Sequence, residues 1–218
     1  MATRGGEILT KEQRLEFTNL AGSISEEEIA AYYTLSSADI EIVNRHRRDH
    51  NRLGFALQLC MLRHPGWPLS IVKEIPARVL GYVAGQIGAD PCTYQLYWQR
   101  EATALEHMDE IRQQYGYKVF DKQVSMALSE ILISGAMENG NSMHLINLAI
   151  SVLRKNMVIL PGMSTIESIV WESRKDAEEK IYGIINGCLT GVQKTKLDEL
   201  LTLKDGNKTK LAWLKEAP

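Results

Sequence analysis

Signals for the start of a helix recur along this chain, and they constrain its fold more than any other feature. In a capping box, a hydroxyl side chain and the residue three positions later each satisfy a free backbone N–H of the first helical turn. The pairs with this spacing are Thr10 with Gln13, Ser25 with Glu28, Ser164 with Glu167 and, as a weaker variant, Ser36 with Asp39. No segment combines alternating polar and β-branched apolar residues with turn dipeptides around it, as a strand would. The sequence therefore predicts an all-α protein.

Proline and glycine divide the predicted helices into groups. HPGWP at residues 64–68 cannot continue a helix, and LPG at residues 160–162 also interrupts one. The expected helices span residues 10–20, 25–33, 36–47, 50–63, 76–88, 94–115, 121–138, 142–158 and 164–187. We predict two small helical bundles with helix-turn-helix-like elements, residues 1–89 and 121–187, joined by a helical linker region at residues 90–120. Residues 188–218 would start a linker to a downstream region.

Composition is that of an ordinary globular protein. With 218 residues and 44% hydrophobic content, the chain can bury one sizeable core or two small ones. Cys60, Cys92 and Cys188 lack the C-x-x-C spacing of a zinc module and predict no disulfide framework, which is typical of a reducing cytoplasm. No apolar run approaches the roughly 18 residues of a membrane-spanning helix, so no membrane contact is expected.

A cluster of cations beside a strongly apolar segment is the clearest functional signal. Residues 44–52 contain four arginines and two asparagines and run directly into LGFALQLCML at residues 53–62. A basic edge beside a buried segment is typical of proteins that neutralise phosphates. Because the formal net charge is -2, any contact with nucleic acid must come from local patches of this kind. A solvated surface without a ligand is the alternative.

Two predicted helices, the second of which runs into this cluster, have the lengths of a helix-turn-helix. Residues 26–33 and 37–48 are joined by a three-residue turn, so the second helix could project into a DNA groove. An αα-hairpin of a small bundle has the same lengths. Asp39 and Glu41 lie at the N-terminal end of the second helix, where a base-reading helix usually enters the groove. We therefore expect the arginines at its C-terminal end to hold phosphates.

The second predicted bundle offers another polar cluster. Its members are Arg154, Lys155, Ser164, Thr165, Arg174 and Lys175. Helix N-terminal amides together with hydroxyls can hold a phosphate, so these residues are candidates for a second DNA contact. A capped helix with surface charges is an equal alternative.

Neither the histidine spacing nor the aromatic residues of the sequence predict a metal site or a catalytic site. His46 and His50 have the i, i+4 spacing of metalloprotease zinc ligands, but Arg47 replaces the glutamate such a site needs. No metal is predicted, and both histidines are expected on a polar face. Aromatic residues at positions 94–98 are expected in the core rather than stacked on bases. Without a G-x-S-x-G, Walker A or recognisable Cys/His motif, a small helical enzyme is only a third class.

The assembled stretches resemble the N-terminal region of the replicative transposases of the Tn-three family. The matching stretches are ILT at residues 8–10, ISEEEIAAYYTLS at 24–36, HRRDHNRLGFALQLC at 46–60, LRHPGW at 62–67, LPG at 160–162 and STIE at 164–167. The third stretch is long and specific. The resemblance covers most of the chain.

The resemblance implies a DNA-binding part of a transposase. In that family, N-terminal helical domains recognise the terminal inverted repeats, and an RNase H-like domain far downstream carries a DDE triad that needs Mg²⁺. No stretch here matches that domain, so neither activity nor a cofactor is expected of this chain alone. The expected partners are double-stranded DNA at transposon ends and the remainder of the transposase. We expect a monomer in the bacterial cytoplasm that is associated with the nucleoid when it is bound to DNA.

Basic and polar residues of both bundles would form the DNA interface. They are Ser37, Asn44, Arg45, Arg47, Arg48, Asn51, Arg52, Arg63, Arg154, Lys155, Ser164, Thr165, Arg174 and Lys175. Arginines of residues 45–52 would set the register on phosphates, and Asn44, Asn51 or Ser37 would form hydrogen bonds to bases. The competing class is a helical interaction module whose basic edge meets an acidic protein partner, for instance the rest of the transposase.

Overall fold

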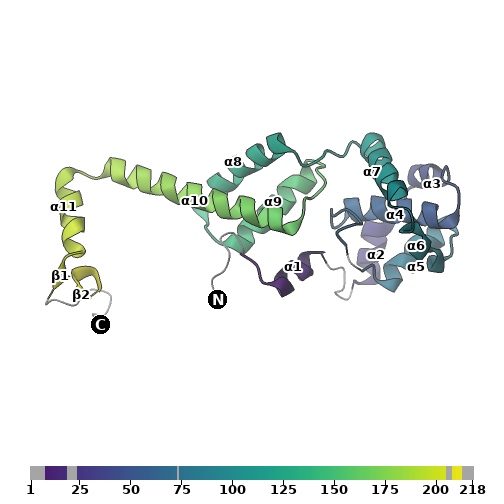
Figure 1. The fold of residues 1–218 in the computed structure, drawn as a ribbon, viewed down its shortest axis with the longest axis horizontal. Helices are drawn as coiled ribbons and strands as arrows, with labels where there is room; N and C mark the ends of the chain where they lie inside the picture. Colours follow the sequence, from purple (N-terminus) through teal and green to yellow (C-terminus); the bar gives the residue numbers. More distant parts are fainter. Residues whose placement is uncertain (1–7, 19–23, 73, 205–207, 213–218) are drawn as a thin grey trace. The chain divides into compact units, whose positions relative to one another are not determined.

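Helices make up most of the structure. The computed structural model describes residues 8–18, 24–72, 74–204 and 208–212. In chain order its helices are α1 (Lys11–Thr18), α2 (Glu26–Tyr33), α3 (Ser37–Val43), α4 (Asp49–Arg63), α5 (Ala77–Ile87), the 3-10 helix η1 (Pro91–Thr93), α6 (Tyr94–Tyr97), α7 (Glu101–Tyr115), α8 (Lys122–Glu138), α9 (Ser142–Lys155), α10 (Met163–Cys188) and α11 (Gly191–Leu200) (Figure 1). The predicted all-α class is confirmed.

The chain forms two compact units, residues 1–174 and 175–218, and the boundary falls inside α10. The predicted division into residues 1–89, 90–120, 121–187 and 188–218 stays a prediction. Parts of the first and last of these segments, residues 1–7, 19–23, 73, 205–207 and 213–218, lie outside the described residues.

Helix α4 is the centre of the first packed region. Residues 53–62 of this helix are all buried, so the helix is covered on every side. Its neighbours are α2, α3, α5, α6 and α7 (Figure 1). A helix that is apolar all round must lie within a core, so the apolar run after the basic cluster fixes that cluster next to the core.

A glycine allows α6 to approach α4 closely. A Cβ atom at Gly54 would overlap the ring of Tyr97, which is only 1% exposed. The Tyr97 hydroxyl donates to Oε1 of Gln58 at 2.9 Å and lies 3.1 Å from Nδ1 of His107. Gln58 Nε2 donates to the carbonyl of Ala104. These buried polar groups therefore satisfy one another inside the core.

The helix predicted at residues 94–115 is in fact two helices. Helix α6 ends at Tyr97, and α7 starts at Glu101 after Arg100 adopts an extended backbone with φ -135° and ψ 94°. Tyr97 is buried and Tyr94 is half-buried, while Trp98 is 37% exposed. The expectation that the aromatic residues of this segment pack in the core is therefore confirmed for Tyr97 and wrong for Trp98.

Helix α3 is shorter than predicted. It ends at Val43, Asn44 forms its C-cap, and residues 44–48 form turns and bends. Arg48 precedes α4 with φ 70° and ψ 137°, a conformation that interrupts a helix and that L residues rarely adopt. The arginines expected at the end of a recognition helix lie instead in a connecting loop. We use the name α3–α4 loop for residues Asn44–Arg48 together with Asn51 and Arg52, which lie in the first turn of α4.

Helices α8, α9 and the first part of α10 form the second packed region (Figure 1). Helix α9 is amphipathic, because its buried residues, Leu145, Ile146, Ala149 and Leu153, recur at helical spacing on one side. It ends at Lys155, three residues earlier than predicted, because Met157 has φ 56°. Val158 then pairs with Lys118 in a short parallel bridge.

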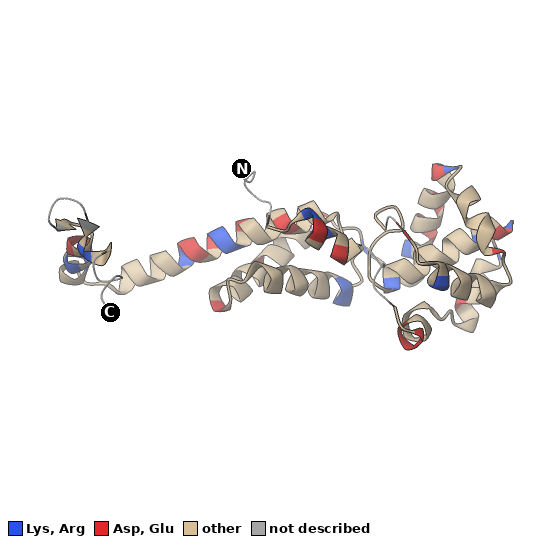
Figure 2. Ribbon diagram, turned by 90° about the horizontal axis from the view of Figure 1, so that it is seen from below, with Lys and Arg blue, Asp and Glu red and all other residues tan. Residues whose placement is uncertain are grey.

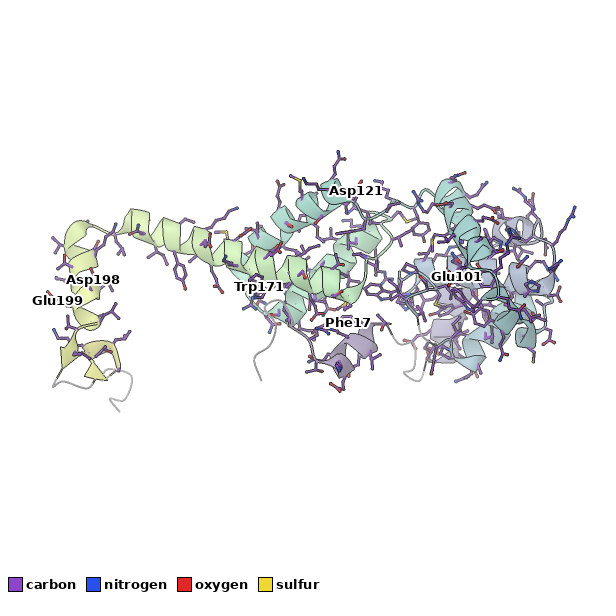
Figure 3. All side chains as sticks on the ribbon, viewed as in Figure 1. Phe17, Glu101, Asp121, Trp171, Asp198 and Glu199 are labelled. Atoms are coloured by element: carbon purple, nitrogen blue, oxygen red, sulfur yellow. The ribbon has the colours of Figure 1, made fainter. Side chains whose placement is uncertain are left out.

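Backbone contacts connect the two packed regions of the first unit. Lys118 N–H donates to the carbonyl of Met157 at 2.8 Å, and Leu160 N–H donates to the carbonyl of Gly66 at 3.3 Å. The indole N–H of Trp67 donates to the carbonyl of Phe17 of α1, labelled in Figure 3, at 3.0 Å. The HPGW turn after α4 therefore contacts both α1 and the segment after α9.

Most predicted helix starts are confirmed. Ser25 and Ser36 each form a full capping box, and Thr10 exchanges hydrogen bonds with Gln13. The pair Ser164 and Glu167 is wrong, because α10 already starts at Met163. The Glu167 carboxylate, 1% exposed, instead accepts from the backbone N–H groups of residues 8 and 9 and from the guanidinium of Arg14. These long-range contacts of Glu167 take the place of the capping box that its spacing predicted.

The second unit contains the end of α10, then α11 and a pair of two-residue strands. Thr190 forms a capping box with Gln193 at the start of α11. Strands β1 (Leu203–Lys204) and β2 (Lys208–Thr209) pair in antiparallel fashion. Within the described parts of both units, none of the helices has the length and apolar character to cross a membrane.

Candidate nucleic-acid interface

The α3–α4 loop presents two arginines without a carboxylate partner. Arg47 and Arg48 are exposed, and neither forms an ion pair with any described residue. Arg45 lies 3.4 Å from the carboxylate of Glu41 on α3, but its side chain is 57% exposed and the pair is weak. Three guanidinium groups on one short loop therefore remain accessible to an anion.

Arg52 is held more tightly than its neighbours. Its guanidinium donates to Asp49 at 2.7 Å, to the side-chain oxygen of Asn44 at 3.2 Å and to the carbonyl of Ile87 at 3.4 Å. Arg52 and Asn44 thus brace the loop against α5, which limits their freedom to contact bases. Asn51 is half-buried. Ser37, at the start of α3, is exposed.

Arg63 is part of a buried ionic network. Its guanidinium makes two hydrogen bonds, of 2.7 and 2.8 Å, to the carboxylate of Asp39, which is 2% exposed. Asp39 also accepts from the Tyr115 hydroxyl at 2.8 Å and from Ser36. Burial alone would raise the pKa of Asp39, but the hydrogen bonds from Arg63, Ser36 and Tyr115 outweigh burial and hold the pKa well below its usual range. The charge of Arg63 is therefore largely neutralised.

His46 and His50 do not share a helical face. His46 lies in the loop and packs against the ring of Phe55, with ring centroids 4.4 Å apart, and against His107 at the same centroid distance. Its Nε2 lies 3.6 Å from a carboxylate oxygen of Glu110. Burial lowers the pKa of His46, although the nearby Glu110 opposes the shift. The expectation of two polar-face histidines is therefore wrong for His46.

Basic residues at the end of α9 border a pocket of about 470 Å³. Arg154 and Lys155 are exposed and have no carboxylate partner among the described residues. Arg154 Nη2 lies 3.2 Å from Nδ1 of His64, and Arg63 also lines this pocket. The structure thus brings Arg63 together with Arg154 and Lys155, predicted DNA-binding residues about 90 positions further along the sequence. We call this concavity the α9 pocket.

The other residues of the predicted second cluster are dispersed. Ser164 and Thr165 are exposed in the first turn of α10, and Ser164 lines a separate hollow with residues of α1. Arg174 donates to the Ser142 hydroxyl at 2.7 Å. Lys175 belongs to the second unit and lies 3.8 Å from the Glu179 carboxylate. Ser164, Thr165 and Arg174 do not line the pocket that contains Arg154 and Lys155.

Three neutral polar residues of the α9 pocket were missed in the sequence. They are Asn147, Ser151 and Tyr117, and none of their side chains has a hydrogen-bond partner within the described part of the chain. Burial raises the pKa of Tyr117, although Arg63 and Arg154 oppose the shift, so its hydroxyl stays protonated and can donate. The spacing of Asn147, Ser151 and Arg154 on one face of α9 could have indicated a polar face.

Charges elsewhere give no further candidate site. Figure 2 shows acidic and basic residues interspersed along α10. Among the described residues, no group of three or more His, Cys, Asp and Glu side chains is arranged to hold a metal ion. Cys60 is buried, and burial raises the pKa of its thiol to about 12, so this thiol is unreactive.

Comparison with known protein families defines the class of this chain. Residues 8–173 match the family described as "Domain of unknown function (DUF4158)", which covers most of its length. The chain belongs to this family. The family description gives no activity, so the relatives supply the biological context.

Several transposases are similar over most of the chain. The chain is 44% identical over 220 residues to the transposase for transposon Tn1546 of Enterococcus faecium, which covers 99% of the chain and 22% of that transposase. It is 36% identical over 202 residues to the transposase for transposon Tn501 of Pseudomonas aeruginosa, covering 92% and 20%, respectively. It is 29% identical over 216 residues to the transposase for transposon gamma-delta of Escherichia coli (strain K12), which covers 97% of the chain and 22% of that transposase.

These relatives confirm the resemblance to the N-terminal region of Tn-three family transposases. The chain spans about a fifth of the length of these relatives.

Proposed function

We propose that this chain binds double-stranded DNA at the terminal inverted repeats of a transposon, as the N-terminal part of a transposase for replicative transposition. The observation that carries the proposal is the α3–α4 loop, where Arg47 and Arg48 are exposed without a carboxylate partner among the described residues. Arginine side chains that form no ion pair within the protein can neutralise phosphates without first breaking a contact. The relatives are transposases for named transposons, which supports DNA as the ligand.

The loop supports phosphate contact better than base readout. Its arginines lie on a turn between helices, and Arg52 and Asn44 are engaged with each other. Arg48 holds a backbone conformation that costs of the order of 1–3 kcal/mol, and such strain is common where a side chain must be presented to a ligand. With about six phosphate contacts in total, affinity should fall roughly a thousandfold between 50 and 200 mM salt.

Binding to repeat DNA across a salt series tests this function. The chain is titrated into a fluorescent duplex carrying the terminal repeat of its own transposon and into a scrambled duplex. We expect a preference for the repeat and a loss of affinity for both duplexes in the double variant R47A/R48A, with a salt slope smaller by about two. The double variant K122A/K180A removes the same charge from exposed positions outside both clusters and serves as the control. Equal, salt-sensitive binding of both duplexes would reduce the function to a nonspecific clamp.

A helical interaction module is the second candidate function, and an apolar hollow of about 630 Å³ favours it. Trp98, Leu105 and Val119 line this hollow, and their side chains are 37%, 68% and 48% exposed. Exposed apolar surface of this kind often marks a protein contact. The proposed partner is the remainder of the transposase, because the chain spans only about a fifth of its relatives. If the basic α3–α4 loop also meets an acidic face of this partner, R47A/R48A would disturb assembly and leave repeat binding intact.

We further propose that DNA cleavage belongs to the rest of the transposase. The RNase H-like domain and its Mg²⁺ would lie outside this chain, which would act as a monomer on DNA in the bacterial cytoplasm. Incubating the purified chain with repeat DNA and Mg²⁺ should give no strand cleavage. Clear turnover would instead favour an enzyme.

A further inference from the structure

We propose that the α9 pocket binds a backbone phosphate of DNA. This inference rests on the proposed function and extends it, because it places a second DNA contact away from the α3–α4 loop. The pocket is lined by cations from two packed regions, Arg63 after the core of α4 and Arg154 with Lys155 at the end of α9. It also contains three neutral groups that can donate hydrogen bonds, on Tyr117, Asn147 and Ser151.

Charge at the pocket is dominated by two residues. Asp39 neutralises Arg63 through two short hydrogen bonds, so Arg63 contributes shape more than charge. Arg154 and Lys155 have no carboxylate within ion-pair distance among the described residues. The C-terminus of α9 carries a partial negative charge of about one half, which opposes an anion. Two full positive charges at the same end outweigh it.

Neutral donors make the pocket suited to an oxyanion rather than to water alone. Asn147, Ser151 and Arg154 lie on one side of α9 because they are spaced by four and three residues. Tyr117, from the segment after α7, also lines the pocket, and its hydroxyl has no partner among the described residues. Cations next to hydroxyl and amide donors are the typical surroundings of DNA phosphates in complexes.

The HPGW turn positions Arg154. Nδ1 of His64 accepts from the Arg154 guanidinium at 3.2 Å, and His64 stacks on Tyr32 with ring centroids 3.8 Å apart. Gly66 has φ 104°, and a Cβ atom there would come within 3.1 Å of Cγ of Arg154. The turn therefore leaves room for the aliphatic part of Arg154 and holds its head group at the edge of the pocket. Part of the arginine's conformational freedom is lost before any ligand binds.

A phosphodiester fits this pocket better than an acidic peptide does. A phosphate accepts from several directions at once, which suits donors that come from α9 and from the segment after α7. The pocket volume exceeds that of a single phosphate and leaves room for an adjoining sugar. Because no base-reading group is required, the pocket should contribute equally to every DNA sequence.

The test compares two double variants of the full chain. R154A/K155A removes the pocket charges, and K122A/K180A removes equal charge elsewhere. We expect R154A/K155A to weaken binding about tenfold on repeat and scrambled duplexes alike, and to lower the salt slope by about one. S151D, which places a negative charge on an exposed position of the pocket wall, should weaken binding as well. The control should bind like the unmodified chain.

A second arm uses inorganic phosphate as the probe and amide chemical shifts as the readout. Shifts at residues 117, 147 and 151 that disappear in R154A/K155A would support the pocket as an oxyanion site. If phosphate shifts these amides but both double variants bind DNA equally, the pocket takes free phosphate only and the proposal is overturned. Equal DNA binding without phosphate shifts overturns it too, while repeat binding by the unmodified chain would leave the proposed function standing. If the unmodified chain binds no duplex, the proposed function fails first.

Discussion

Helices α4 and α9 are central to the two packed regions of the first unit, and they differ in how much of their surface is buried. Helix α4 is buried on all sides over residues 53–62, whereas α9 is buried along one side. Polar and charged groups near α4 therefore need partners, as Arg63 has in Asp39 and Gln58 has in Tyr97. Arg154 and Lys155 at the end of α9 have no such requirement.

This difference in burial decides which arginine substitutions can test DNA binding without disturbing the fold. Removing Arg63 would leave the buried Asp39 carboxylate without its partner, so lost DNA binding in that variant would be ambiguous. Removing Arg154 breaks only an exposed contact to His64. Function is therefore tested most cleanly at α9 and on the α3–α4 loop. The experiments below probe this contrast through stability.

The largest expected effect is at the contact between α4 and α6. Gly54→Ala would push a methyl group into the Tyr97 ring, which cannot move without breaking its contacts to Gln58 and His107. We expect a loss of about 3 kcal/mol or more in the free energy of unfolding, measured by urea titration.

Gly81→Ala on α5 is the matched control. No atom lies within 4 Å of a Cβ at this position, so alanine should raise stability by roughly 0.5–1 kcal/mol through its helix propensity. Equal effects of the two glycine substitutions would mean that α4 is not packed on all sides, and the contrast with α9 would be lost.

Asp39→Asn should cost about 3 kcal/mol of stability. The substitution leaves the guanidinium of Arg63 without its counterion in a partly buried site, and removing one member of such a pair is more destabilising than removing both. Urea unfolding of D39N, R63M and the double variant measures the coupling.

Asp109→Asn provides the comparison for D39N. Asp109 also pairs with an arginine at 2.7 Å, but its side chain is 63% exposed, so its loss should change stability by under about 0.5 kcal/mol. A cost for D39N as small as that for D109N would show that the network around Asp39 contributes little, contrary to its burial.

Acid should destabilise the α4 region through His107. Burial, and then the neighbouring His46, lower the pKa of His107 to about 4, against an ordinary value near 6.5. Between these values the unfolded chain binds more protons than the folded chain, so stability falls as the pH falls from about 6.5 to 4. The full effect is about 3 kcal/mol, and urea titrations across this range measure it. Phe55, Tyr97 and His46 surround the ring and offer no counterion for a charged form.

His107→Gln should flatten this pH dependence, whereas His144→Gln, an exposed position on α9, should leave it unchanged. A pH dependence that persists in H107Q would assign the titration to another group. His46, whose pKa burial also lowers, would be the next candidate.

The sequence predicts the local features of this fold well. Capping at Ser25 and Ser36 depends on residues three positions apart, so these helix starts were found from spacing alone. The burial of residues 53–62 follows from their apolar character. The end of α3 at Val43 and the φ of 70° at Arg48 were missed, because no glycine or proline between these positions marks a break in the sequence.

The long-range features could not be predicted in the same way. Asp39 was interpreted as a helix-dipole charge, but its main partner, Arg63, is 24 residues away. Glu167 has the spacing of a capping residue, yet it contacts residues 8 and 9. Arg154 was a predicted DNA contact, but Arg63 and Tyr117, which line the α9 pocket with it, come from separate parts of the chain. Such pairings carry no local signal, because they arise only when helices pack.

The smallest expected effect is on the stability of the α9 variants. Arg154 and Lys155 are exposed, and Arg154 makes only one hydrogen bond to an imidazole nitrogen. R154A/K155A should therefore change the free energy of unfolding by no more than about 0.5 kcal/mol, as measured by urea titration. A loss comparable to that of D39N would mean that the contact between Arg154 and the HPGW turn stabilises the two packed regions. The weaker DNA binding expected of this variant would then have a structural cause, and S151D alone could report on the pocket.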